Sequence, residues 1–289
     1  MKNRIAVYWQ YGATTHTGWF RTLNEDRSLL RMGTSGGGTP YAAAVLADGM
    51  GGTEDGGLAS ETAVQMVKEW LDARSPGLWD APNLWNAMER ELRGLFLAIH
   101  IKLKANGDRL GTTLTILLLS GGSYFVAHIG DCRVMHVRDD GRYRLLSRDH
   151  TWVRTRRIPS SKAVRHPKRH VLTQSLGMQG MPSVYFRSGV YMPGSLFLLS
   201  SDGFHGRFTT RAIAAMLQKE LQQEGDLQQA CDRLMARALW RQAGDNISLL
   251  SIRPMGEIPP RKELVRLYLQ HGLRRLKKIH TLIPVFGRK

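Results

Sequence analysis

The chain has 289 residues, of which 42% are hydrophobic and 22% charged, with a formal net charge of +17. This composition excludes disordered and fibrous proteins, and no apolar run reaches the roughly 18 uncharged residues of a membrane span. The first residues lack the charged-then-apolar pattern of a secretion signal, so we expect a cytoplasmic protein. The length fits two domains, or one large α/β or α+β domain with a tail.

Seven apolar and β-branched runs predict strands. In chain order they are Ile5–Tyr11, Tyr41–Ala47, Leu114–Leu119, Tyr124–Ile129, Val134–Val137, Leu196–Ser200 and Ile247–Ile252. Serine and glycine at 120–123 join two of these runs as a hairpin. Such a short link makes the pair antiparallel, because parallel strands need a crossover of a dozen residues or more. The pattern therefore argues against a Rossmann-like chain.

Four stretches have apolar residues near the 3.6-residue spacing of an amphipathic helix. They cover about 58–73, 84–103, 211–220 and 227–240. Antiparallel strands with paired helices outside them predict an α+β fold built in layers. Met255 to Pro260 has the composition of a linker. We therefore predict one domain over residues 1–253 and a basic, partly helical extension over 254–289.

Four aspartates stand at the ends of strand-like runs, each beside a glycine or another small residue: Asp48, Asp131, Asp202 and Asp245. A strand end lets a carboxylate project from a rigid element, and an adjacent glycine lets a ligand approach closely. Each aspartate alone is more often a turn residue than a ligand. Four together, with an acidic cluster at 24–26 and no histidine or thiol partners, favour an oxygen-preferring ion such as Mg²⁺ or Mn²⁺ over zinc.

These residues belong to an ordered series of short motifs. The series is Arg21-x-x-Asn24-Glu25-Asp26, Asp48-Gly49-Met50-Gly51-Gly52, Gly111-Thr112-Thr113, Gly130-Asp131-x-Arg133, Asp149-His150, His166-Pro167 followed by Leu172-Thr173-x-x-Leu176-Gly177, Ser201-Asp202-Gly203 and Asp245-Asn246-Ile247. Over about residues 5–253 it resembles the metal-dependent serine/threonine protein phosphatases of type 2C in their compact bacterial form. The resemblance implies a four-layer α-β-β-α sandwich of two antiparallel sheets flanked by helix pairs.

The resemblance also implies a metal ligand set. Asp48 matches the carboxylate that bridges two metal ions, and the backbone carbonyl of Gly49 would join one of them. Asp202 and Asp245 would complete the protein ligands of the first ion, and Asp131 with Asp202 matches a weaker third site of bacterial members. The implied cofactors are two Mn²⁺ or Mg²⁺ ions, with room for a third. Such a pair activates a bridging water to attack phosphorus near neutral pH.

The remaining matches concern the surroundings of the metals. Glu25 and Asp26 match acids that hold metal-bound waters, and Arg21 matches the arginine that binds the substrate phosphate. A guanidinium suits that task because it can clamp two phosphate oxygens at once. Met50 stands where eukaryotic members have a histidine proposed as general acid. Cys132 replaces the usual serine, and we interpret it as a small buried residue in preference to a redox-sensitive neighbour of the metals.

The excess positive charge lies in two patches. Residues 142–170 hold ten Lys and Arg against one acid, and residues 254–289 hold nine against two. The first patch includes the family's flap at about 149–170, which either recruits an acidic or multiply phosphorylated partner or is a solvated loop without one. The second has a helical apolar pattern that suits an acidic partner or an anionic membrane surface, or docking on the body of the protein.

Several histidines and tryptophans lie outside these motifs. His205, two residues after Gly203, is within reach of the predicted site. Structural or exposed positions are expected for His16, His100 and His136. Four tryptophans in or beside the helical patterns are expected in the core: Trp70, Trp79, Trp85 and Trp240.

The sequence therefore predicts a cytoplasmic enzyme that hydrolyses phosphoserine and phosphothreonine on proteins by a metal-activated water, opposing a bacterial serine/threonine kinase. Its expected partners are phosphorylated proteins, including that kinase and its substrates, and nucleic acid is not expected. A regulatory protein such as an anti-sigma-factor antagonist stays open as the substrate. The alternative is a non-catalytic binding protein on the same fold, which would hold an acidic partner or nucleic acid through the flap and the tail.

Overall fold

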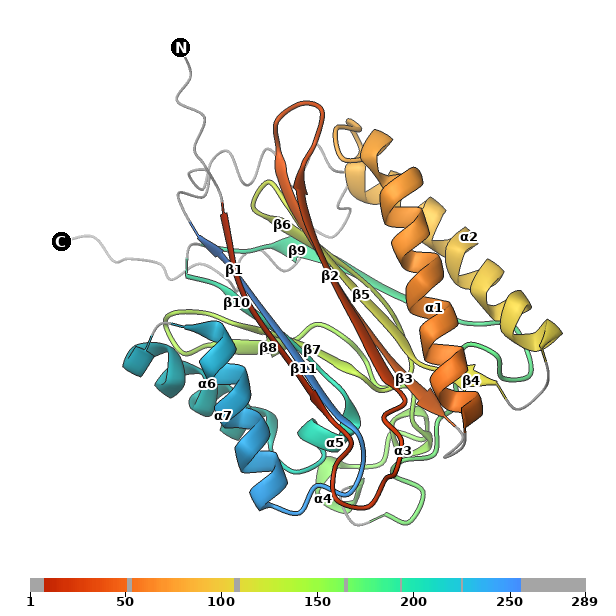
Figure 1. The fold of residues 1–289 in the computed structure, drawn as a ribbon, viewed down its shortest axis with the longest axis vertical. Coiled ribbons are helices and arrows are strands. Elements are labelled where there is room, and N and C mark those ends of the chain that lie inside the picture. The colour runs from red at the N-terminus through yellow and green to blue at the C-terminus, as the bar shows by residue number, and fades with distance from the viewer. Residues whose placement is uncertain are drawn as a thin grey trace.

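The computed structural model describes residues 8–50, 54–106, 110–163, 166–192, 194–224 and 226–255. These residues form four layers, in which two antiparallel β-sheets pack face to face and a helix pair covers the outer face of each (Figure 1). The predicted α+β sandwich is confirmed. The helix predicted in the C-terminal extension lies outside the described residues, and the domain boundary at residue 253 stays a prediction.

The first sheet has the strand order β1-β11-β10-β7-β8. Its strands are β1 (Tyr8–His16), β7 (Arg133–Val137), β8 (Tyr143–Leu145), β10 (Leu196–Ser200) and β11 (Ile247–Met255). Each neighbouring pair is antiparallel. The helices α6 (Thr210–Glu224) and α7 (Leu227–Trp240) cover its outer face, where their apolar sides bury Leu217 and Leu234 against the strands.

The second sheet has the order β2-β3-β5-β6-β9, and β4 pairs with β3 beyond it. Its strands are β2 (Asp26–Thr34), β3 (Pro40–Met50), β4 (Gly111–Thr112), β5 (Leu114–Ser120), β6 (Ser123–Ile129) and β9 (Tyr185–Val190). The helices α1 (Glu54–Ala73) and α2 (Leu84–Ala105), joined through a short 3₁₀ turn at Ser75–Gly77, cover its outer face. Within the described part of the chain, no helix has the length and apolarity needed to cross a membrane.

Strand β3 is buried on both faces. Val45 and Ala47 pack toward the helices, while Ala44 and Leu46 pack into the layer between the two sheets. Successive side chains of a strand point to opposite faces, so a strand with apolar layers on both sides is a continuous apolar run. The position of its end, which carries Asp48, is therefore fixed from both sides.

The strands that the sequence did not predict lie mostly at the edges of the sheets. Strands β2, β8 and β9 are edge strands, and β4 is only two residues long. Edge strands are partly exposed, so their hydrophobic alternation is weak. In β2 the strand pattern is further interrupted by Arg27 and Arg31, whose side chains form ion pairs with α1. The buried strands were all predicted, because burial selects a continuous apolar run.

The tryptophan prediction is right for three residues and wrong for the fourth. Trp70, Trp79 and Trp85 are buried in the core between α1, α2 and the second sheet. Trp240 is 84% exposed. It is the last residue of α7, where helical spacing no longer determines which side of the chain meets the sheet.

His136 is a partly buried histidine of β7. Its ring stacks on Phe197 with the centroids 4.7 Å apart, and its Nε2 lies 2.9 Å from Ser195 Oγ. Burial, and then the positive charges of Arg138 and Arg144, lower the pKa of His136 to about 4. The folded pKa is thus below the unfolded value of about 6.5. The neutral ring of His136 therefore contributes its full stabilisation above about pH 6.5, and this stabilisation is lost as the pH falls toward 4.

We expect His136→Phe, which retains an aromatic ring for the stack, to weaken this acid sensitivity. Between pH 7 and pH 5 the free energy of unfolding of the wild type should fall by about 2 kcal/mol more than that of the variant. Urea unfolding at both pH values measures the difference. Values at pH 7 and pH 8 serve as the control, since both lie above the unfolded pKa. An equal fall in both proteins would contradict the assignment.

Candidate active site

The predicted site residues come from both sheets and gather at one end of the sandwich, the lower edge in Figure 1. Asp26 begins β2, Asp48 is near the end of β3, and Asp131 lies between β6 and β7. Asp202 begins the short helix α5 (Asp202–His205) directly after β10, and Asp245 precedes β11. We call these five residues the carboxylate cluster.

Asp26 and Asp48 are directly opposite each other in the β2–β3 pair. Asp26 is buried, its Oδ2 accepts a hydrogen bond from Ser201 Oγ at 2.8 Å, and its Oδ1 has no hydrogen-bond partner among the described residues. Burial raises the pKa of Asp26 to about 7. Burial, and then the charges of Asp26 and Asp202, raise the pKa of Asp48 well above its ordinary value. The two carboxyl groups therefore lie on the same side of the β2–β3 pair, where like charges repel each other.

Asp131 is the second buried acid of the cluster and is 7% exposed. Burial, and then the charges of Asp202 and Asp149, raise its pKa well above the ordinary value. Asp149 itself is paired with Arg133, with Nε–Oδ1 and Nη2–Oδ2 distances of 3.1 and 2.7 Å. Because this two-pronged ion pair occupies the guanidinium of Arg133, Asp131 remains the poorly compensated charge.

Each of the other two acids of the cluster contacts a basic side chain. Arg21 Nε lies 2.9 Å from Asp245 Oδ1, and its Nη2 donates to Oδ2 at 3.0 Å. His170, which the sequence did not single out, places its Nδ1 3.4 Å from Asp202 Oδ2. Burial would raise the pKa of Asp202, but the contact with His170 and nearby positive groups hold it below its ordinary value. Asp202 therefore stays ionised more readily than Asp26, Asp48 and Asp131.

The side chains of the cluster lie near one another, but they do not converge on one point as the ligands of a metal ion would. Over the described residues, no three acidic, histidine or cysteine side chains are close enough together to hold a metal ion. Asp48 nevertheless lies within electrostatic range of the four other members of the cluster. Mutual repulsion, and the pairing of two members with Arg21 and His170, account for their separation.

The backbone of Asp48 is fixed by the Gly-Thr-Thr motif. Thr113 N donates to the carbonyl of Asp48 at 2.9 Å, and Thr113 Oγ1 accepts from Asp48 N at 2.9 Å. Thr112 Oγ1 donates to the same carbonyl at 3.0 Å. No side chain fits at Gly49, where a Cβ would lie 2.1 Å from the carbonyl oxygen of Gly56. The motif therefore holds the strand end that carries the carboxylate.

Asn246 fastens the link between β1 and β2, which carries Arg21. Its Oδ1 accepts from Glu25 N at 2.9 Å, and its Nδ2 donates to the carbonyls of Thr17 and Leu23 at 3.0 and 2.9 Å. The side chain is buried, and both ends of its amide are used. Asn246 thus couples the phosphate-binding candidate and the acid Glu25 to the start of β11.

The acidic segment at the start of β2 is ordered by its own neighbours. Asn24 Oδ1 accepts from Asp26 N at 3.1 Å, and Asn24 Nδ2 donates to Thr15 Oγ1 at 2.8 Å. Arg27 Nη1 donates to the carbonyls of Asn24 and Asp26, and its Nε contacts Glu61 of α1 at 2.6 Å. Arg27 was not predicted as part of the site, although a basic residue directly after the Asn-Glu-Asp run was visible in the sequence.

The family model of protein phosphatase 2C matches residues 22–242. The chain belongs to this family. It is 30% identical to a putative protein phosphatase 2C-type of Streptococcus pyogenes over 179 residues, which cover 60% of this chain and 71% of the relative. It is 28% identical to the serine/threonine protein phosphatase PstP of Mycobacterium tuberculosis over 257 residues, which cover 86% of this chain but only 45% of PstP.

Solved structures of this family have the same fold. The serine/threonine phosphatase of S. agalactiae gives a TM-score of 0.73 at 25% identity, over 85% of this chain and 99% of that one. A structure of the catalytic domain of PstP in complex with two manganese ions gives 0.66 at 25% identity, over 86% and 100%. The chain is therefore a protein phosphatase, a metal-dependent enzyme that acts on phosphorylated proteins.

The flap of the phosphatase contains α3 (Trp152–Thr155) and α4 (Ser160–Ala163). Its base is held by Trp152 N, which donates to the carbonyl of Val171 at 2.8 Å, and the Trp152 ring stacks on His166 with centroids 4.9 Å apart. Six of the seven Lys and Arg between residues 149 and 170 are described and exposed: Arg154, Arg156, Arg157, Lys162, Lys168 and Arg169. The seventh, Arg165, lies outside the described residues.

Two residues near the phosphatase site are structural. Cys132 is fully buried, its Sγ lies 3.3 Å from Thr113 Oγ1, and burial raises the pKa of its thiol, as expected of a space-filling residue. His205 is also buried, with Nδ1 3.3 Å from Ser200 Oγ. Burial lowers the pKa of His205 to about 3, so its ring is neutral and donates no positive charge to the carboxylate cluster.

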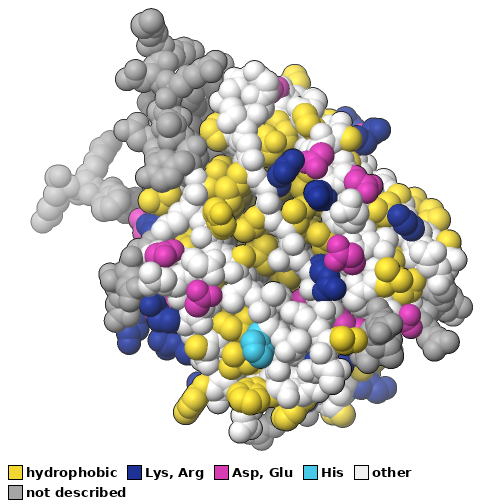
Figure 2. All heavy atoms as spheres, in the orientation of Figure 1, with side chains coloured by type: hydrophobic (Ala, Val, Ile, Leu, Met, Phe, Trp, Pro, Cys, Tyr) yellow, Lys and Arg dark blue, Asp and Glu magenta, His cyan; other side chains and the backbone are white. Residues whose placement is uncertain are grey.

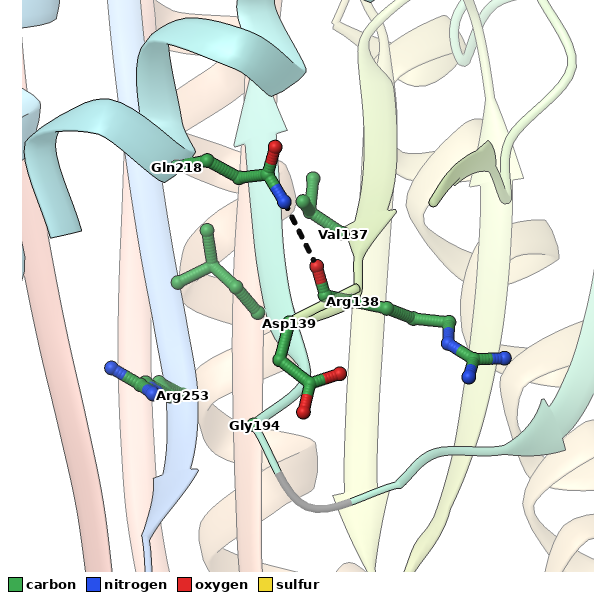
Figure 3. A pocket seen from close by; sticks show the side chains of 7 residues that line it. Val137, Arg138, Asp139, Gly194, Gln218 and Arg253 are labelled. Atoms are coloured by element: carbon green, nitrogen blue, oxygen red, sulfur yellow. Dashed lines mark hydrogen bonds between the residues drawn. The ribbon is translucent and has the colours of Figure 1, made fainter. Parts of the chain in front are cut away.

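A small pocket of about 160 Å³ lies at the other end of β7 and β10 from the carboxylate cluster (Figure 3). It is lined by Val137, Arg138, Asp139, Gly194, Leu196, Gln218 and Arg253. The guanidinium groups of Arg138 and Arg253 point away from each other (Figure 3). Because the charged side chains that line the pocket do not point toward a common point, we do not assign phosphate hydrolysis to it.

Replacing Asn246 with alanine is expected to lower the free energy of unfolding by about 1–3 kcal/mol, because the buried N–H of Glu25 then loses its acceptor. Urea unfolding of the two proteins measures this. Asn86→Ala, at an exposed position of α2, is the matched control and should change stability by less than about 0.5 kcal/mol. Equal stability of Asn246→Ala and the wild type would show that the link does not depend on this amide.

Proposed function

We propose that this phosphatase hydrolyses phosphoserine and phosphothreonine at the carboxylate cluster, with Asp48, Asp131, Asp202 and Asp245 as metal ligands. The observation that carries the proposal is the pair of buried Asp26 and half-buried Asp48, which are directly opposite each other with raised pKa values and, among the described residues, form no ion pair with a cationic side chain. Buried carboxylates are kept together where they pair with cations. This argues for a cation-binding function of the pair.

The chemistry of the donors fits a hard divalent cation. The candidate donors are carboxylate oxygens and the backbone carbonyl of Gly49, and the neighbouring Cys132 thiol is kept protonated by burial. We propose that Asp48, Gly49, Asp202 and Asp245 would hold two Mn²⁺ or Mg²⁺ ions, and that Asp131 and Asp202 would hold a third. When bound, the cations neutralise the cluster and supply a water nucleophile that is active near neutral pH.

The side chains around the cluster would position the substrate. The fork of Arg21 already holds two oxygens of a carboxylate, that of Asp245, in the two-pronged geometry suited to two oxygens of a phosphate. Glu25 and Asp26 are proposed to orient water through their buried carboxyl groups. Phosphoryl transfer depends on positioning and charge neutralisation more than on a protein nucleophile. Met50 brings no proton, so the leaving oxygen must take its proton from elsewhere.

The substrates are proposed to be proteins phosphorylated by a bacterial serine/threonine kinase, including the kinase itself. Because protein kinases consume ATP, these substrates are expected in the cytoplasm. The exposed basic residues of the flap favour acidic or multiply phosphorylated segments through charge complementarity. All the predicted carboxylates are present in the chain, which disfavours the non-catalytic alternative. An acidic partner or anionic membrane surface for the tail concerns residues outside those described.

Arg21→Ala is expected to raise KM for a phosphothreonine peptide by about tenfold to a hundredfold with a much smaller change in kcat, because two charge-assisted hydrogen bonds to phosphate are lost. Arg21→Lys should recover only part of the loss, since lysine cannot form the fork. Phosphate release in Mn²⁺ is the readout, and EDTA is the control. Undiminished release in EDTA would overturn the metal-dependent proposal, and an unchanged KM would overturn the role of Arg21.

A further inference from the structure

Four large apolar side chains are exposed beside the candidate site. Their exposed fractions are 63% for Trp19, 77% for Phe20, 49% for Leu23 and 84% for Trp240. The first three belong to the link between β1 and β2, and Trp240 ends α7. We call these four residues the apolar rim. Monomeric proteins rarely gather large exposed apolar side chains without an interaction to serve.

The two parts of the rim are bound together. Trp19 Nε1 donates to the carbonyl of Leu239 at 2.7 Å, directly before Trp240 in the chain. Trp19 N donates to the carbonyl of Ala243 at 2.9 Å. The ring of Phe20 packs over Gly244, where a Cβ would lie 2.4 Å from Phe20 Cδ2. These contacts fix the positions of Trp19 and Phe20 at the surface.

The rim adjoins the proposed phosphate-binding group, Arg21. Arg21 lies between Phe20 and Leu23 in the chain, and its guanidinium is on Asp245, next to the Gly244 that supports Phe20. Several hydrophobic side chains lie along the lower edge of the molecule in Figure 2, where Figure 1 has the link after β1 and the end of α7. If Arg21 binds the phosphate of a substrate, the substrate residues next to the phosphorylated one would therefore contact the rim.

The size of the rim favours a peptide segment over a second copy of the chain. Aromatic side chains bury about 150–250 Å² each when fully covered, so four partly exposed apolar residues offer on the order of 400 Å². A stable protein interface buries about 800 Å² on each partner. The rim fits a short segment of two to four residues.

We propose that the apolar rim binds large apolar residues next to the phosphorylated serine or threonine, so that the enzyme prefers phosphosites with such neighbours. This selectivity rests on the proposed function of the site. Trp19 and Trp240 would supply rigid contact area at a low cost in side-chain entropy, as aromatic anchors do in other recognition surfaces.

The test compares two phosphothreonine peptides that differ only in flanking Leu and Phe against flanking Ser. The ratio of their kcat/KM values is the readout, because a general loss of activity cancels in it. The wild type is expected to favour the apolar peptide by about tenfold. Phe20→Ser and Trp240→Ser should bring the ratio toward one, while Ile101→Ser, 58% exposed on α2, should keep it. A ratio near one in the wild type, or one retained by the rim variants, would overturn the proposal.

A second measurement separates the rim from the chemistry. Fluorescence anisotropy of the labelled peptides with metal-stripped protein reports binding without turnover. Tighter binding of the apolar peptide, lost in Trp240→Ser, supports the rim even when no phosphate is ever released, in which case only the proposed function fails. Hydrolysis without any binding preference overturns the rim and leaves the proposed function intact. A dimer in sedimentation that Trp240→Ser dissociates would assign the rim to a second copy and overturn the proposal.

Discussion

Asp26, which is buried, and Asp48, which is half-buried, stand opposite each other on neighbouring strands with raised pKa values, and Asp131 is buried close by. Folding has to bring these like charges together and remove them from water, which is unfavourable for both reasons. The apolar layers on either side of the sheets offset this cost through burial of side chains such as Phe96 and Phe197. The fold thus holds the carboxylates close together in spite of their repulsion, and a bound cation would reduce that repulsion by neutralising their charge.

The scaffold holds the acids at a sheet-to-sheet junction and not within one element. Ser201, after β10, donates to Asp26 Oδ2 on β2 and accepts from Ser248 N on β11. Asn246 links the same strand to the segment before β2. Because the Ser201–Asp26 and Asn246–Glu25 bonds cross between the two sheets, the relative position of the acids depends on the packing of the whole sandwich. A local change in one loop should therefore alter the site less than a change in the layer between the sheets.

The sequence was sufficient for the acids and insufficient for their partners. Asp48 and Asp202 could be predicted because each ends a buried apolar run, and burial leaves a strong pattern. Strand β2 was missed because an edge strand with charged residues has no such pattern. His170 and Arg27 act through contacts between distant segments, which spacing along one chain does not contain.

Trp240 shows a further limit of periodicity. A helical pattern identifies the buried face of α7, but at the last residue the chain leaves that face and the indole turns to solvent. The family motifs cover the chemistry of phosphate release. They say nothing of the exposed aromatic residues around Arg21, which became visible only when β1, α7 and the segment before β11 were seen together.

The most direct measurement is the thermal unfolding of metal-stripped protein, with and without Mn²⁺, for the wild type and Asp48→Asn. If buried like charges await a cation, Asp48→Asn should unfold a few degrees higher than the wild type without metal, on the order of 1 kcal/mol. Mn²⁺ should raise the Tm of the wild type, as a ligand of the folded state does, and leave that of the variant nearly unchanged. A less stable metal-free variant with an undiminished Mn²⁺ shift would contradict the account.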